Sequence, residues 1–101
     1  MGLLDFFKSN STDYITDFKS RNAIIVDVRT PGEFRQGAIK GSKNIPLQDI
    51  NNHLVELKKL NRPVITCCAS GMRSGSAASI LKRNGIEVVN GGGWMSLEKR
   101  L

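Results

Sequence analysis

The fold of this chain is decided by the stretch Val64-Ile65-Thr66-Cys67-Cys68-Ala69-Ser70-Gly71-Met72-Arg73-Ser74. Its β-branched residues predict a strand over residues 63–67, and the small residues that follow predict a helix over residues 73–84. Gly85 then ends the helix, because glycine tolerates the left-handed backbone of a helix C-terminus. A strand, a short glycine-containing loop and a helix N-terminus in this order can present a cysteine thiolate to an anionic substrate.

The other strands are predicted from apolar segments before and after this stretch. Residues 23–29 form a continuous apolar run, which is typical of a central strand covered on both faces. Residues 42–46 predict a short strand that Pro46 ends or confines to an edge, and residues 87–90 predict another strand. The glycines at positions 91–93 are interpreted as a flexible turn.

Helices are predicted between and around these strands. Residues 12–20 and 94–100 predict short helices at the two ends of the chain. A third helix begins after Thr30, because Thr30 can cap it, Pro31 suits its first position and Glu33 completes a capping box.

Residues 47–60 predict the clearest helix of the chain. Their apolar stripe consists of Ile50, Leu54, Val55 and Leu57. Strands that alternate with helices predict an α/β fold: a single domain with a mainly parallel central sheet and helices on both faces. Such sheets bind ligands beyond the carboxyl ends of their strands, which is where Cys68 falls.

The composition is that of one ordinary globular domain over residues 1–101, with a helical extension over 1–22 and a core over 23–93. The net charge of +6 is scattered and lacks interleaved aromatic residues, so nucleic acid is not expected as a partner. A mild positive field that attracts small anions is expected instead. Residues 1–8 are too short and too interrupted for a signal peptide or a membrane span. We therefore expect no membrane partner and a cytoplasmic protein.

The two cysteines are adjacent, which argues against a disulfide between them. Consecutive Cα atoms lie about 3.8 Å apart, below the usual disulfide range. His53 is the one histidine of the chain, so no ligand set for a metal is present and no metal is expected. A reduced, reactive thiol fits the pattern better.

The loop from Cys68 to Arg73 has the features of an anion cradle. Its N–H groups can point inward, Gly71 permits an unusual backbone angle, and the helix end and Arg73 add positive charge. A free cysteine is about 3% thiolate at pH 7, and lowering its pKa by about two units makes roughly three quarters of it thiolate. No histidine base is required.

An ordered set of motifs gives this chain its resemblance to a known family. The motifs are Val26-Asp27-Val28-Arg29, Glu33-Phe34, Gly37-Ala38-Ile39 with Gly41, Asn44-Ile45-Pro46, the loop Cys68–Ser74 and Gly91-Gly92. The chain resembles a single-domain rhodanese, a sulfurtransferase module. The resemblance implies a rhodanese-like fold and an enzyme of the thiosulfate sulfurtransferase type that needs no cofactor.

The resemblance also implies roles for the loop. Cys68 attacks the outer sulfur of a donor such as thiosulfate and holds it as a persulfide, and cyanide, a thiol or a protein acceptor then takes the sulfur. The substrate-binding residues implied are Ala69, Ser70, Gly71, Met72 and Arg73. Their N–H groups stabilise the persulfide, and Arg73 holds the sulfonate of a small anionic donor.

Three other residues carry open interpretations. Asp27 and Arg29 match the Asp-x-Arg of the family, and they either line the site or brace loops through hydrogen bonds and a pair with Glu33. Trp94 is either a hydrophobic plug at the end of the sheet or a wall of the site. The chain departs from the family at Ala38, where a histidine is usual.

The choice of nucleophile depends on the length of the loop. Counted from Cys68, Arg73 is the sixth residue, and counted from Cys67 it is the seventh. The shorter loop suits a single sulfur on Cys68, with Cys67 as a strand residue behind it or a partner that resolves oxidised Cys68. The longer loop resembles that of phosphatases and arsenate reductases, which implies oxyanion chemistry at Cys67. A non-catalytic persulfide carrier is the third alternative.

Overall fold

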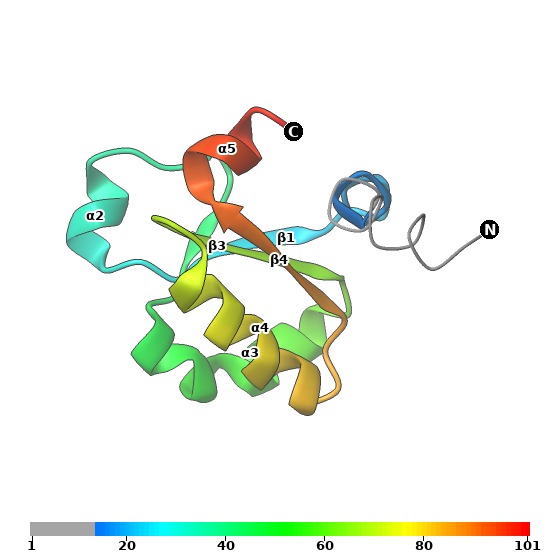
Figure 1. Ribbon diagram of the computed structural model, residues 1–101. Coiled ribbons are helices and arrows are strands. Elements are labelled where there is room, and N and C mark those ends of the chain that lie inside the picture. Colours follow the sequence, from blue (N-terminus) through cyan, green and yellow to red (C-terminus); the bar gives the residue numbers. More distant parts are fainter. Residues whose placement is uncertain (1–13) are drawn as a thin grey trace.

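The computed structural model describes residues 14–101 (Figure 1). After a helix over residues 14–20, the elements are β1 (Ile24–Asp27), α2 (Pro31–Arg35), β2 (Lys43–Asn44), the 3-10 helix η1 (Leu47–His53), α3 (Leu54–Leu60), β3 (Val64–Cys68), α4 (Met72–Arg83), β4 (Val88–Gly93) and α5 (Trp94–Glu98). The expectations for residues 1–8, and for the helix start at residue 12, lie outside the described residues. None of the helices that the structure describes has the length and apolar character needed to cross a membrane.

The strands form one parallel sheet in the order β2-β1-β3-β4. β1 and β3 are its central strands, and their register pairs Ile24 with Val64 and Asp27 with Cys67. The short strand β2, which ends before Pro46, lies at an edge of the sheet. The N–H that Pro46 lacks therefore does not interrupt the hydrogen bonds between two central strands. The predicted α/β fold with a parallel sheet is confirmed, and it places the ends of β1 and β3 side by side.

Each face of the sheet packs into its own hydrophobic core, because successive strand residues point to opposite sides. What we call the α4 core consists of Ile24, Val26, Val28, Ile45, Ile50, Leu57, Val64, Cys68, Ala77, Leu81 and Ile86. What we call the α5 core consists of Ile15, Phe18, Ile39, Ile65, Cys67 and Leu97. Figure 1 shows the corresponding layers, with α3 and α4 on one side of the sheet and α5 on the other.

The helix predicted over residues 47–60 is present, but it has two parts: η1 has 3-10 geometry, and α3 begins only at Leu54. Pro46 stands at the start of η1, and no side chain caps this end. Its first N–H groups are therefore satisfied by tighter bonds, such as the one that Asp49 N–H donates to the Pro46 carbonyl over 2.8 Å.

The prediction that Val55 belongs to the buried stripe of this segment is wrong. Ile50 and Leu57 are buried, whereas Val55 is 67% exposed. Residues two positions apart on an α-helix point about 200° away from each other. The helix that buries Leu57 in the α4 core therefore turns Val55 to solvent.

The glycines at positions 91–93 are the end of β4 and not the flexible turn that was expected. The register of β4 against β3 shifts here, and Gly93 pairs with Cys68. A Cβ on Gly91 would lie 2.8 Å from Ile65 Cγ2, and one on Gly93 would lie 2.9 Å from the Ala69 carbonyl oxygen. Glycine is needed because β4 passes very close to β3 and the loop that follows it.

Candidate active site

Cys67 and Cys68 are neighbours at the end of β3, and their side chains enter opposite cores. Residues that follow one another in a strand point to opposite faces. Cys68 therefore joins the α4 core and Cys67 joins the α5 core. Both cysteines are free, and neither is more than 1% exposed. The alternation of the strand thus places the two thiols in separate environments.

Cys68 Sγ lies at the carboxyl end of β3, in front of the N-terminus of α4. The N–H of Gly71 donates to the sulfur over 3.0 Å and the N–H of Ser74 over 3.4 Å. The Ser74 hydroxyl oxygen is 3.3 Å from it. Burial by itself raises the pKa of Cys68, but the neighbouring Ser74 side chain and hydrogen bonds from the N–H groups of Ser74, Gly71 and Ser70 outweigh burial and lower this pKa. The surroundings of Cys68 favour its thiolate.

Cys67 has the opposite surroundings. Burial, followed by repulsion from the nearby Asp27 carboxylate, raises the pKa of Cys67 to about 12. The positive charge of Arg29 works against this rise but does not cancel it. Cys67 is therefore a neutral thiol at physiological pH, packed among the apolar side chains of the α5 core.

The loop between the two elements holds its shape through one unusual backbone angle. Gly71 has a φ of +104°, and a Cβ on it would lie 3.3 Å from the Cα of Gly92. Ala69 and Ser70 are exposed, and Met72 points to solvent with 81% exposure. Of the predicted loop residues, Gly71 and Ser70 direct their N–H groups at Cys68, whereas the Met72 side chain points away from it. The Ser74 N–H, one residue beyond the predicted range, adds a donor to the sulfur.

Two polar side chains without a predicted role, those of Ser74 and Asn90, fasten the loop to β4. The Ser74 hydroxyl donates to Asn90 Oδ1 over 2.7 Å, and Asn90 Nδ2 donates to the Gly71 carbonyl over 3.1 Å. The Gly92 N–H donates to the same Oδ1 over 2.9 Å. Ser74 is fully buried. A serine directly after Arg73 and an asparagine at the end of the strand predicted over residues 87–90 are visible signals, but nothing in the sequence indicates that they meet.

Arg73 forms an ion pair with Glu33. Its two terminal nitrogens donate to the two carboxylate oxygens over 2.8 and 3.1 Å. Glu33 belongs to the predicted capping box of α2, which is confirmed: its N–H donates to Thr30 Oγ1, and its Oε1 accepts from the Thr30 N–H. The hydrogen bonds from Arg73 and from Thr30 lower the pKa of Glu33 to about 2. The pair is therefore charged throughout the physiological range.

Asp27 and Arg29 form a buried ion pair on the same side of the sheet as Cys67. Arg29 donates to the Asp27 carboxylate over 2.7 to 3.0 Å and to the Gly37 carbonyl over 2.7 Å. Its guanidinium carbon lies 4.8 Å from the ring centre of Trp94. The expected pair of these residues with Glu33 is wrong, because the Glu33 carboxylate is bound by Arg73 instead. The observed contacts tie the end of β1 to the segment after α2, as a brace does.

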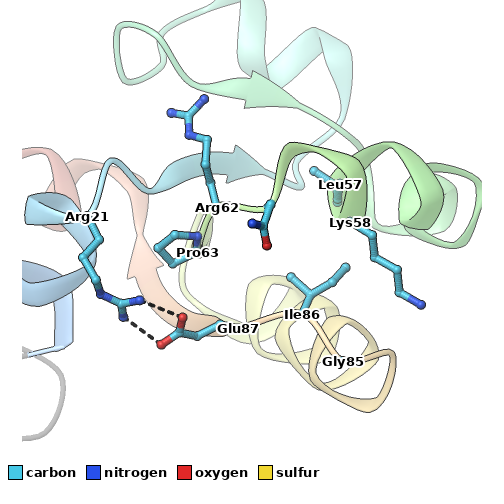
Figure 2. Close-up of a pocket in the computed structure, with 9 residues that line it drawn as sticks. Arg21, Leu57, Lys58, Arg62, Pro63, Gly85, Ile86 and Glu87 are labelled. Carbon is cyan, nitrogen blue, oxygen red and sulfur yellow. Dashed lines mark hydrogen bonds and ion pairs between the residues drawn. The ribbon is translucent and has the colours of Figure 1, made fainter.

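A cavity of about 500 Å³ lies at the other end of the sheet (Figure 2). It is lined by residues that precede β3 and β4, such as Arg62 and Ile86, and Figure 2 shows the Arg21–Glu87 ion pair beside it. Because the strands are parallel, Cys68 is at the far end of β3, roughly 16 Å away for five residues. Within residues 14–101, no group of three or more His, Cys, Asp and Glu side chains is placed to hold a metal ion.

Comparison with known proteins connects this geometry with one group of proteins. The family model described as Rhodanese-like domain matches residues 11–99. The uncharacterized protein YqhL of Bacillus subtilis is 42% identical over 65 residues, which cover 64% of this chain and 51% of that protein. The chain thus spans about half the length of this relative.

Two further proteins match over most of their length. Thiosulfate sulfurtransferase GlpE of Ectopseudomonas mendocina is 31% identical, with 82% of this chain and 75% of that protein covered. The crystal structure of a rhodanese-like domain protein from Staphylococcus aureus superposes with a TM-score of 0.71 at 36% identity and covers 86% of both chains.

Proposed function

The chain belongs to the family of rhodanese-like domains, and we propose that it is a sulfurtransferase in which Cys68 carries the transferred sulfur. One observation carries the proposal. The N–H groups of Gly71 and Ser74 converge on Cys68 Sγ, and they lower its pKa in spite of burial. Relatives named thiosulfate sulfurtransferase support the same class of reaction.

The proposed reaction has two steps. The Cys68 thiolate attacks the outer sulfur of thiosulfate, the sulfur–sulfur bond of the donor breaks, and sulfite leaves with the electron pair. Cyanide, a small thiol or a thiol of an acceptor protein then attacks the outer sulfur of the persulfide, and the Cys68 thiolate is regenerated. The persulfide is an anion, so the N–H groups of the loop from Ala69 to Arg73 and of Ser74 stabilise it as they stabilise the thiolate. No cofactor takes part in either step.

Two observations favour Cys68 over Cys67 as the nucleophile. Cys67 lies on the opposite face of the sheet, and its pKa is raised to about 12. A seven-residue oxyanion cradle counted from Cys67 would need that side chain to leave the α5 core. Oxyanion chemistry at Cys67 is therefore the weaker candidate. Both cysteines are free, which suits the reducing cytoplasm that we propose as the protein's location.

The test compares Cys67→Ser with Cys68→Ser. The wild-type protein is incubated with thiosulfate, its intact mass is measured, and thiocyanate formation is followed after cyanide is added. We expect the mass of one added sulfur in the wild type and in Cys67→Ser, and neither sulfur uptake nor thiocyanate in Cys68→Ser. Activity that survives in Cys68→Ser but is lost in Cys67→Ser would contradict the assignment.

The same assay separates the alternatives. Hydrolysis of an aryl phosphate without sulfur uptake would support oxyanion chemistry at Cys67. A carrier would accept sulfur from a persulfide but would turn over thiosulfate negligibly.

A further inference from the structure

Arg29 and Arg73, at this end of the sheet, offer no free positive charge to the Cys68 site. Arg73 is paired with Glu33, and Arg29 is paired with Asp27. The thiolate of Cys68 is held by the N–H groups of Gly71 and Ser74. Each arginine is thus neutralised by a carboxylate before any donor arrives. The net charge of the chain predicts a positive field, but Glu33 cancels this field locally at Arg73. Arg73 is the residue to which the family resemblance assigns the sulfonate of the donor.

We propose that Glu33 determines donor specificity: its carboxylate occupies Arg73, so that the site disfavours sulfonate donors such as thiosulfate and favours persulfides of thiols. The inference rests on the proposed sulfurtransferase function. The inference concerns the chemical class of the donor, and Glu33 acts on it without touching the reacting sulfur.

The geometry of the pair makes Glu33 a direct competitor for an oxyanion. Both terminal nitrogens of Arg73 are engaged, one by each carboxylate oxygen. A sulfonate prefers the same two parallel hydrogen bonds, because its oxygens are spaced like those of a carboxylate. Thiosulfate must therefore displace Glu33 or forgo this contact.

Glu33 is also held in place independently of Arg73. Its Oε1 accepts from the Thr30 N–H over 3.0 Å and from the Thr30 hydroxyl over 3.1 Å. These bonds form the cap of α2, so moving the carboxylate away from Arg73 also disrupts a helix start. A carboxylate anchored in this way competes better than a freely rotating side chain.

Electrostatic repulsion acts in the same direction. Thiosulfate is a dianion. It must approach the Cys68 thiolate and, beside this thiolate, the Glu33 carboxylate, which stays ionised. The reacting group of a thiol persulfide carries at most one charge and no sulfonate, and any other charges of the thiol lie several bonds away from the outer sulfur. Its outer sulfur is attacked by Cys68, the sulfur–sulfur bond of the donor breaks, and the donor thiolate leaves with the electron pair. This step needs no guanidinium contact, so Glu33 does not impede it.

The first experiment measures kcat and KM for thiosulfate and for glutathione persulfide in the wild type and in Glu33→Gln. Glutamine keeps the capping box but removes the charge. We expect kcat/KM for thiosulfate to rise about three- to fivefold, mainly through a lower KM, because the pair is only partly exposed. The value for glutathione persulfide should change less than twofold.

The control is Glu56→Gln, which removes a carboxylate of similar exposure from an ion pair with Lys43. Glu56 lies on α3 and takes no part in the cap of α2. Glu56→Gln should leave kcat/KM unchanged for both donors. An equal change for both donors in Glu33→Gln, or no change at all, overturns the role of Glu33 in specificity.

A second experiment does not depend on sulfur transfer. Alkylation of Cys68 by iodoacetate and by iodoacetamide is compared, and the modified peptide is identified by mass spectrometry. The two reagents differ in charge, so the ratio of their rates reports the field at the sulfur. In Glu33→Gln this ratio should rise about threefold, and the rise should shrink at high salt.

The two readouts distinguish failure of this inference from failure of the proposed function. An unchanged alkylation ratio overturns the role of Glu33 whether or not the protein transfers sulfur. A raised ratio in a protein that transfers sulfur from neither donor would support the electrostatic role of Glu33 and overturn the sulfurtransferase function.

Discussion

Cys67 and Cys68 are consecutive residues of β3, and their thiol pKa values are shifted in opposite directions. The Cys67 side chain shares the α5 core with apolar groups and faces the Asp27 carboxylate, so its neutral form is stabilised. The Cys68 side chain faces the N–H groups at the start of α4, which stabilise its thiolate. A single peptide bond therefore separates an inert thiol from a nucleophile.

The first prediction concerns the pH dependence of alkylation. Because the folded-state pKa of Cys68 is lowered, its reaction with iodoacetamide should have a midpoint below the ordinary cysteine value of about 8.5. Reactivity should persist as the pH falls and disappear only when the pH passes through that lowered pKa. Cys67, with a pKa of about 12, should remain unmodified up to pH ~9. Peptide mass spectrometry assigns each modification.

Unfolding supplies the control for that measurement. In guanidinium chloride both cysteines should react with a common midpoint near ~8.5. Equal labelling of Cys67 and Cys68 in the native protein would contradict the separation of the two environments.

The second prediction concerns Ser74. Replacing it with alanine removes the hydroxyl that lies 3.3 Å from Cys68 Sγ but keeps the N–H donor. The hydroxyl donates to Asn90 Oδ1 in this structure and must rotate to donate to the thiolate. Its loss should therefore raise the pKa of Cys68 by less than the roughly one unit that a full hydrogen bond of ~1.5 kcal/mol to a charged group contributes. The pH profile of alkylation measures this rise. Ser79→Ala, on the exposed side of the same helix, should leave the profile unchanged.

The third prediction concerns the close approach of β4 to β3. In Gly91→Ala the new Cβ would meet Ile65, Leu97 and the Thr66 carbonyl at 2.8 Å. Overpacking of this kind should lower the free energy of unfolding by about 1–3 kcal/mol, measured by urea denaturation. Gly32→Ala is the matched control, because its Cβ would have no neighbour closer than 3.9 Å. A stability of Gly91→Ala equal to that of the control would refute the packing argument.

The fourth prediction concerns the buried ion pair. Arg29 as a residue is 4% exposed, and Asp27→Ala leaves its guanidinium without a carboxylate partner. Breaking one side of a buried pair should lower the free energy of unfolding by about 3–5 kcal/mol. The comparison is Glu87→Gln, which breaks the exposed pair with Arg21 and should change stability little. Similar losses in both variants would show that Asp27 and Arg29 do not act as a brace.

Local sequence patterns predicted the elements whose causes are local. Thr30, Pro31 and Glu33 lie within one helical turn, and the capping box that they predict is present. The apolar run at residues 23–29 predicts a central strand, because only a strand covered on both faces needs apolar residues at successive positions. The β-branched residues before Cys67 likewise predicted a strand, with Cys68 at its carboxyl end.

The sequence misled where neighbours from other elements decide the conformation. Three glycines in a row are typical of a turn, yet Gly91 and Gly93 are required by the atoms of β3 and its loop. The segment from Leu47 has helical spacing, but Pro46 and the lack of a cap make its first half a 3-10 helix. The atoms that surround the glycines are not visible in a local pattern, whereas Pro46 is visible but was interpreted only as the end of a strand.

By itself, the sequence determined the succession of strands and helices along the chain. It also determined the strand–loop–helix unit that holds Cys68. Both follow from backbone preferences and periodicity over a few residues. Only the tertiary structure decided which charges and hydrogen bonds meet there. Glu33 and Arg73 are 40 positions apart, and Ser74 and Asn90 are 16 apart. Such contacts depend on how α2, α4 and β4 are packed together. That packing sets the charge around the loop from Cys68 to Arg73, which the local spacing of residues had already identified.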